Sequence, residues 1–249
     1  MREIQIIPVI EVKDGRAIEA VKGKTVEYRE LRSSTAGSSD PLDIAASLER
    51  IGFGEIFILD LDGIVDDRPN YEMLSTISQK TCLLVMADIG AWTLEDMLNL
   101  DRIKPVISTE TFSSLNTLSF PRDFVLSLET RDEELLSAMN LPLKEFIRII
   151  KDSTKIREIL LVNRTRISTS MGPDIDLCSF VAKELSDRIL MYGGGVRNMD
   201  DVHKLYDAGI QKVLVGSAIH SGALLKELFS GLAKPQVIIG NQQEYGNRE

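Results

Sequence analysis

Two glutamates stand at the ends of apolar runs, where a carboxylate could exchange protons with a bound substrate. Glu11 follows the apolar start of IIPVIEVKDGR. Glu129 directly follows the similar run FVLSL in the second half of the chain. Two carboxylates that flank a sugar can act as general acid and general base when their surroundings separate their pKa values. The alternative is that both side chains simply end a strand in solvent. We predict Glu11 and Glu129 as the catalytic residues.

Two glycine-containing turns near the C-terminus could hold an anion. Gly193, Gly194 and Gly195 follow an apolar run in YGGGVRNMDDV, and Gly216 and Ser217 begin the next helix in KVLVGSAIHSG. Glycines let backbone N–H groups approach an anion closely, and a helix N-terminus adds a positive dipole. The alternative is that the glycines only form tight turns between strand and helix. We predict these five residues as a phosphate site.

Further polar residues follow two other apolar runs. Asp60 and Asp62 lie in FILDLDGI, where one carboxylate could cap the next loop and the other could hold a ribose hydroxyl. Arg164 and Arg166 lie in LLVNRTRISTS, and paired arginines suit bidentate binding of phosphate or carboxylate. We predict all four as substrate-binding residues, with capping and solvated surface as the alternatives. His220 could help to hold an anion, although a place on a helix surface is favoured.

The composition excludes several classes of function. The chain has 249 residues, with 38 acidic against 29 basic side chains and a net charge of −9. Without a Lys/Arg-rich run, neither a nucleic acid nor a membrane surface is an expected partner. The start MREIQIIPVIEV is too short and too quickly charged for a signal peptide or a membrane span, so a cytoplasmic location is predicted.

Cysteines and histidines are too few and too scattered for a zinc site, so neither a metal nor a cofactor is expected. Cys82 and Cys178 lie in apolar stretches and are interpreted as small buried hydrophobic residues in a reducing compartment. The expected partner is a small phosphorylated metabolite. The oligomeric state is left open.

Short apolar runs alternate with segments of helical period, which indicates repeated βα units around a parallel sheet. The predicted strands are Ile4–Ile10, Glu55–Leu61, Thr81–Ala87, Pro105–Ser108, Phe124–Leu128, Glu158–Val162, Arg188–Tyr192 and Lys212–Val215. The predicted helices are Pro41–Ile51, Asn70–Gln79, Thr93–Leu100, Arg131–Met139, Leu143–Ser153, Ile175–Ser186, Met199–Ala208 and Ala223–Leu232. Eight alternations predict an α/β fold, the (β/α)8 TIM barrel. A doubly wound sheet is the alternative, and the lack of an early GxGxxG weakens it.

Internal similarities indicate two half-barrels of four βα units each, which would place the two glutamates at equivalent strand ends. KPVISTETFSS resembles KVLVGSAIHSG, and MADIG followed by TLEDM resembles YGGGVRNMDDV. The segment Lys13–Asp40 is predicted as the first βα loop and as a candidate mobile lid. We assign residues 1–235 to one barrel domain and 236–249 to a C-terminal tail, whose apolar start could add a short strand.

These motifs together resemble the histidine-biosynthesis barrel family, which includes ProFAR isomerase and the cyclase subunit of imidazole glycerol phosphate synthase. The resemblance runs from Ile6 to about Leu232, and it is most specific in GGGVRN and VGSAIHSG. It implies an Amadori-type conversion of an aldose to a ketose without metal or cofactor. One carboxylate would protonate the furanose oxygen, and another would move the proton from C2.

The chain departs from the family pattern at several positions. Glu11 and Glu129 stand where the family has aspartates, and Asp88 puts a negative charge where the first phosphate would bind. Glu19 replaces a usual basic residue, and the Asp-Gly of the sixth loop is Ile167 and Ser168. We therefore expect one phosphate site to be kept and the other lost.

Three hypotheses follow from this pattern. The first is a divergent isomerase-like enzyme that acts on a singly phosphorylated sugar or ribonucleotide. The second is a barrel that binds a phosphorylated metabolite with little or no catalysis. The third is a cyclase-type subunit, which would need a glutaminase partner and the basic residue that Glu19 replaces.

Overall fold

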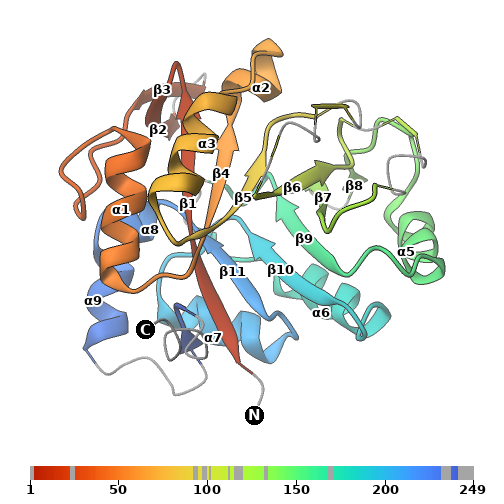
Figure 1. The fold of residues 1–249 in the computed structure, drawn as a ribbon. Coiled ribbons are helices and arrows are strands. Elements are labelled where there is room, and N and C mark those ends of the chain that lie inside the picture. The colour runs from red at the N-terminus through yellow and green to blue at the C-terminus, as the bar shows by residue number, and fades with distance from the viewer. Residues whose placement is uncertain are drawn as a thin grey trace, which may run out of the picture.

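Eight parallel strands pair side by side, and the ring closes because the last of them pairs with the first (Figure 1). In ring order they are β1 (Ile4–Lys13), β4 (Glu55–Asp60), β5 (Leu84–Asp88), β6 (Ile103–Ser108), β7 (Val125–Arg131), β9 (Glu158–Asn163), β10 (Ile189–Gly193) and β11 (Lys212–Val215). The computed structural model describes residues 3–22, 26–91, 95–96, 100, 102–111, 113–114, 120–131, 134–167, 171–230 and 237–240. The predicted (β/α)8 barrel is confirmed.

Helices follow the strands and cover the outside of the ring. Their bounds are α1 (Pro41–Ile51), α2 (Leu61–Asp66), α3 (Tyr71–Lys80), α5 (Leu143–Asp152), α6 (Ile175–Glu184), α7 (Met199–Asp207), α8 (Ser217–His220) and α9 (Ala223–Phe229). Helix α1 begins where the sequence predicts, because the Asp40 carboxylate accepts hydrogen bonds from the backbone N–H groups of Leu42 and Asp43. The short helix α2 was not predicted, whereas α8 begins at Ser217, where the sequence predicts the start of a helix.

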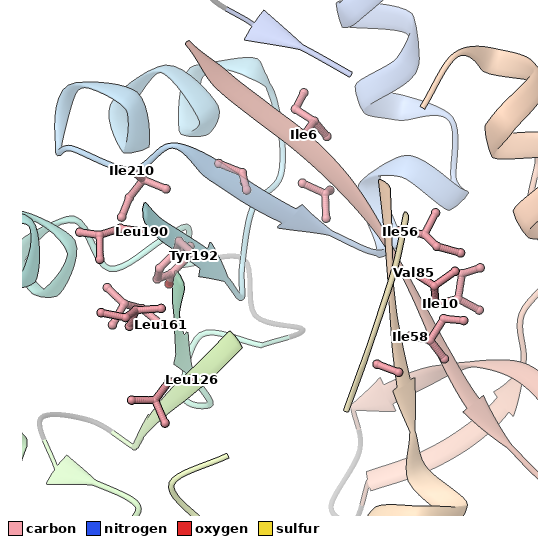
Figure 2. Close-up of a cluster of buried hydrophobic side chains, with 14 of the residues drawn as sticks. Ile6, Ile10, Ile56, Ile58, Val85, Leu126, Leu161, Leu190, Tyr192 and Ile210 are labelled. Carbon is pink, nitrogen blue, oxygen red and sulfur yellow. The ribbon is translucent and has the colours of Figure 1, made fainter. Parts of the chain in front are cut away.

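Alternating side chains divide the core into an outer and an inner part. Outward residues such as Ile6, Ile58 and Leu161 are fully buried in the outer core, part of which Figure 2 shows. The inner core takes one residue from each strand of the ring, namely Ile7, Phe57, Met86, Val106, Val125, Leu160, Met191 and Leu214. This apolar layer closes the barrel interior, so a ligand can enter only above it.

The first βα segment is not the plain loop that was predicted. Strand β1 continues into an antiparallel hairpin with β2 (Arg16–Lys22), which pairs in turn with β3 (Val26–Glu30). The turn consists of Asp14 and Gly15, with φ angles of 50° and 69°. An Asp-Gly pair favours the left-handed conformation of a two-residue hairpin turn, and this signal was overlooked. In Figure 1 the hairpin lies at the same end of the barrel as α2.

The helix predicted over Arg131–Met139 is wrong. Strand β7 runs to Arg131 and turns back into the antiparallel strand β8 (Glu134–Leu135). The return is fixed by hydrogen bonds from the Leu136 N–H to the Glu129 carbonyl and from the Ala138 N–H to the Thr109 carbonyl. Backbone pairing to two strand ends therefore outweighs the helical pattern of the side chains. Most residues of the helix predicted over Thr93–Leu100 lie outside the described residues.

The chain after α9 adds one short strand. β12 (Val237–Ile238) pairs in parallel with the start of β1, so the apolar start of the tail adds a short strand, as the sequence suggested. Residues 241–249 lie outside the described part of the chain. Cys178 is buried as predicted, but Cys82 is exposed, because it precedes β5 beyond the end of α3. Among the described residues, no helix is long and apolar enough to cross a membrane.

Candidate functional site

A cavity of about 660 Å³ opens at the carboxyl ends of the barrel strands, above the inner apolar layer. Phe57, Leu160 and Leu214 of that layer form part of its wall. The polar groups that line it come from the ends of the strands and the loops that follow them. Active sites of (β/α)8 enzymes lie at this face of the barrel.

Glu11 lines the cavity from the end of β1. Ile7, four residues earlier on the same strand, belongs to the inner core. Because side chains of a strand alternate between its two faces, Glu11 points to the same interior. Among the described residues, no hydrogen bond or ion pair engages its carboxylate. Burial raises the pKa of Glu11, which favours its protonated form. Glu11 is therefore suited to donate a proton.

Glu129 lines the same cavity from β7, four strands further round the ring. Only 7% of the residue is exposed. Its Oε1 accepts a hydrogen bond from Ser108 Oγ at 2.8 Å, and its Oε2 lies 2.6 Å from Arg164 Nε. Both oxygens of this carboxylate are therefore engaged by donors. The two glutamates thus lie across the barrel from each other in different surroundings.

The wall beside Glu129 is acidic. Asp88 ends β5 with 5% of the residue exposed, and the N–H of Gly90 donates to its Oδ1 at 3.0 Å. Burial, followed by the nearby charge of Glu129, raises the pKa of Asp88 to about 7. Glu110 also lines this wall and shares the guanidinium of Arg164 with Glu129. One arginine is thus surrounded by three carboxyl groups.

The glycines of the predicted phosphate site line the opposite wall. Gly194 and Gly195 have φ angles of 119° and 72°. A Cβ atom on Gly195 would lie 2.9 Å from the carbonyl oxygen of Gly172, so a side chain is excluded there. Among the described residues, no turn, loop or cap bond uses the backbone N–H groups of Gly194, Gly195, Gly216 or Ser217. The Gly194 N–H extends the β10–β11 ladder, in which Gly193 pairs with Leu214, so Gly195, Gly216 and Ser217 carry the open donors.

The sequence comparisons agree with this geometry. The model of the histidine biosynthesis protein family matches residues 5–225. The chain belongs to that family. A ProFAR isomerase of Parabacteroides distasonis is 26% identical, over 90% of this chain and 98% of its own. Another, from Persephonella marina, is 23% identical, over 89% of this chain and 96% of its own.

An uncharacterized protein of Methanocaldococcus jannaschii is also similar to this chain. It is 28% identical over 233 residues, which are 91% of this chain and 98% of the relative. The predicted family resemblance is confirmed. Family membership agrees with the barrel fold, and several relatives are named as isomerases. The activity of this chain has to be inferred from its own cavity.

Two predicted substrate-binding residues of this family member lie away from the cavity. Asp60 Oδ1 accepts from the Gly63 N–H at 3.3 Å and from Asn70 Nδ2 at 2.8 Å, so this carboxylate caps α2 and fixes the start of α3. Asp62 accepts from Asn70 Nδ2 at 2.7 Å and from the Asp14 N–H at 3.0 Å. Both carboxylates hold loops together, which was the alternative considered for them.

The two predicted arginines separate in the structure. Arg164 lines the main cavity, whereas Arg166 lines a second cavity of about 940 Å³, to which residues of α5 and α6 contribute. Ile167 lines the main cavity, and Ser168 lies outside the described residues. Glu19 lines the main cavity and accepts a hydrogen bond from Arg29 Nε at 2.8 Å.

His220 is not on a helix surface as predicted, because only 4% of it is exposed. Its Nε2 lies 2.6 Å from the carbonyl oxygen of Val9, and its Nδ1 lies 3.2 Å from Ser33 Oγ. Burial lowers the pKa of His220, so the neutral ring donates from Nε2 and accepts at Nδ1. The ring ties α8 to β1 and to the segment after β3.

Sequence reasoning missed Glu110 and Arg32 as cavity residues. Glu110 follows Ser108 and Thr109 at a strand end, and that position was the available signal. Arg32 follows a hairpin that was not predicted, and no motif in the surrounding sequence marks it as a cavity residue. Within the described ranges, no group of three or more His, Cys, Asp or Glu residues is placed to hold a metal ion.

Proposed function

We propose that this protein is an isomerase that converts a phosphorylated aldose, carried by a sugar or ribonucleotide, into the corresponding ketose. The observation that carries the proposal is the pair of glutamates on opposite sides of one cavity. Glu11 has no partner among the described residues and a raised pKa, while Glu129 is held by Arg164 and Ser108. Unequal surroundings of two carboxylates separate an acid from a base.

The chemistry would follow the Amadori pattern of a 1-aminoaldose. Protonated Glu11 gives its proton to the furanose oxygen, the C1–O bond breaks, and the nitrogen lone pair forms a C1=N bond. Ionised Glu129 takes the proton from C2, and the electrons of the C–H bond form a C1=C2 enolamine. Return of a proton to C1 from Glu129, with loss of the C2 hydroxyl proton to Glu11, gives the ketose and restores both residues.

The charges in the cavity support a substrate with one phosphate. Among the described residues, no turn, loop or cap bond uses the backbone donors of Gly195, Gly216 and Ser217 at one wall. At the other wall, Glu110 and Glu129 outnumber the single Arg164 in surroundings of reduced dielectric, and Asp88 adds a further negative charge above its pKa of about 7. A second phosphate there would face like charges.

The test replaces each glutamate by glutamine and follows exchange of the substrate C2 proton with deuterium from solvent, using proton NMR on a panel of phosphorylated 1-aminoaldoses. Loss of a general base lowers rates by about 10²- to 10⁴-fold, so Glu129→Gln should abolish measurable exchange. Glu11→Gln should leave the ring closed and block product formation. Exposed Glu27 on β3 does not line the cavity, so Glu27→Gln is the matched control.

Complementation separates the possible substrates. We expect the gene not to support robust growth of a strain that lacks ProFAR isomerase, because ProFAR carries two phosphates. Robust growth would refute the single-phosphate part of the proposal and would leave the acid/base part standing.

One observation favours a second candidate function, a barrel that binds a phosphorylated metabolite without turnover. Both carboxylate oxygens of Glu129 are already engaged, by Ser108 and Arg164. A base that must keep these bonds is less free to accept a proton. Unchanged metabolite binding in Glu11→Gln and Glu129→Gln, with no exchange in the wild-type protein, would support binding alone.

A further inference from the structure

The cavity contains few positive charges for a phosphate. Of the residues that the structure describes, the cationic side chains that line it are Arg32, Arg164 and Arg197. Arg164 is paired with Glu129 and Glu110 at the acidic wall. Arg197 is paired with Asp201, with Nε 2.8 Å from Oδ2 and Nη2 2.8 Å from Oδ1. Two of the three guanidinium groups are thus neutralised by carboxylates.

Arg32 differs from the other two arginines. It is exposed, it lines the cavity, and no ion pair or side-chain hydrogen bond engages it within the described ranges. The nearest acidic side chain along the hairpin that also lines the cavity is Glu19, and Glu19 is paired with Arg29 on the neighbouring strand. The hairpin therefore satisfies its own carboxylate and leaves Arg32 free.

Hydrogen bonds fasten the Arg32 segment to the wall that carries the late glycines. The Ser34 N–H donates to the carbonyl oxygen of His220 at 2.8 Å, and Ser33 Oγ lies 3.2 Å from His220 Nδ1. His220 is separated from Ser217 by only two residues and is itself bonded to the Val9 carbonyl. Ser33, the residue after Arg32, is thus fixed to the short segment that follows Gly216. In the ring this segment follows β11, whereas the acidic wall is formed from β5 and β7.

We propose that Arg32 is the cation that binds the substrate phosphate in this cavity. The inference rests on the proposed function, which places one phosphate on the glycine amides. A planar guanidinium can donate two hydrogen bonds to one phosphate, and its charge counts for more in a cavity than in water. His220 and Ser33 act as positioning residues, because their contact fixes the chain directly after Arg32.

The same placement would orient the substrate. Arg32 and the glycine amides lie at one wall, and three carboxyl groups lie at the other. The two walls therefore have opposite electrostatic character. A singly phosphorylated ligand then has one favourable direction, with the phosphate toward Arg32 and its uncharged or amine-bearing end toward Glu129. Reversal would place the phosphate against Asp88.

The experiment titrates the full chain with inorganic phosphate by isothermal calorimetry and phosphorus NMR, at low and high salt. Arg32→Gln should weaken binding by about ten- to a hundredfold, the usual value of a hydrogen bond to a charged group, and should flatten the salt dependence. Arg32→Lys keeps the charge but loses the planar guanidinium, so its phosphate affinity should lie between those of the wild type and Arg32→Gln. Arg68, which is 71% exposed and does not line the cavity, gives the control Arg68→Gln with the same change in net charge.

The outcomes separate this inference from the proposed function. Equal phosphate affinity of wild type, Arg32→Gln and Arg68→Gln would overturn the role of Arg32 and leave the glycine site intact. Absence of phosphate binding by the wild-type protein would instead remove the phosphate site from the proposed function, and the inference with it. A weakened Arg32→Gln variant whose thermal unfolding matches that of Arg68→Gln supports the inference, because the fold is then unchanged.

Discussion

Asp88 should make the protein less stable as the pH rises, and its removal should reverse the effect. Burial raises the pKa of Asp88 from 3.8 to about 7. Well below pH 3.8 the carboxyl is protonated in both the folded and the unfolded chain, so it has no effect. Between pH 4 and 7 the unfolded chain releases the proton and the folded chain keeps it, so stability falls by about 1.4 kcal/mol per pH unit. About three units of pKa difference give a total of about 4 kcal/mol above pH 7.

Asp88→Asn tests this reasoning because the amide cannot ionise and its oxygen can still accept from the Gly90 N–H. We expect the variant to be more stable than wild type by up to about 4 kcal/mol at pH 8, with little difference at pH 3.5 to 4. Urea unfolding at several pH values measures this difference. Exposed Asp123 gives the control Asp123→Asn, which should leave the pH dependence unchanged. A difference between Asp88→Asn and wild type that is the same at every pH would refute the argument.

Two further substitutions, one of them with a matched control, test the frame of the barrel. Gly195→Ala places a Cβ 2.9 Å from the carbonyl oxygen of Gly172, so it should destabilise the fold by more than about 1 kcal/mol and weaken phosphate binding. Gly15→Ala, at a similar φ of 69° but with open space around the Cβ, measures the strain alone in the same thermal unfolding assay. Lys212 lies at the opposite end of the barrel, and Lys212→Met leaves Glu55 without the ammonium that lies 2.9 Å away. The variant should lose about 3 kcal/mol of the free energy of unfolding, measured in urea. An unchanged unfolding midpoint would show that the pair contributes nothing.

The strands and their order could be predicted because they are buried on both faces and appear as short apolar runs. The bounds of β11 and α1 agree with the prediction, and Asp40 caps α1 as its position suggested. The ends of the other strands shift by a few residues, since pairing with neighbours rather than composition decides where a strand stops. The hairpins after β1 and β7 were missed for the same reason.

The contacts that give the site its character could not be predicted. Arg164 meets Glu129 over 35 positions of sequence, and Ser33 meets His220 over 187 positions. Both contacts depend on which strands become neighbours when the ring closes. Candidates that sequence reasoning put together, such as Asp60 with the substrate, were separated because their carboxylates found nearer backbone and amide donors.

The difference between the two walls of the cavity arises from equivalent positions in the two halves of the barrel. In MADIG and MYGGG, Met86 and Met191 both belong to the inner core, so the residues two positions later, Asp88 and Gly193, face the same interior. A carboxylate therefore occupies in one half the space that a glycine leaves open in the other. This one exchange at a strand end contributes to the difference between a glycine-lined wall and an acidic wall, so the cavity is asymmetric although the two halves of the barrel are similar.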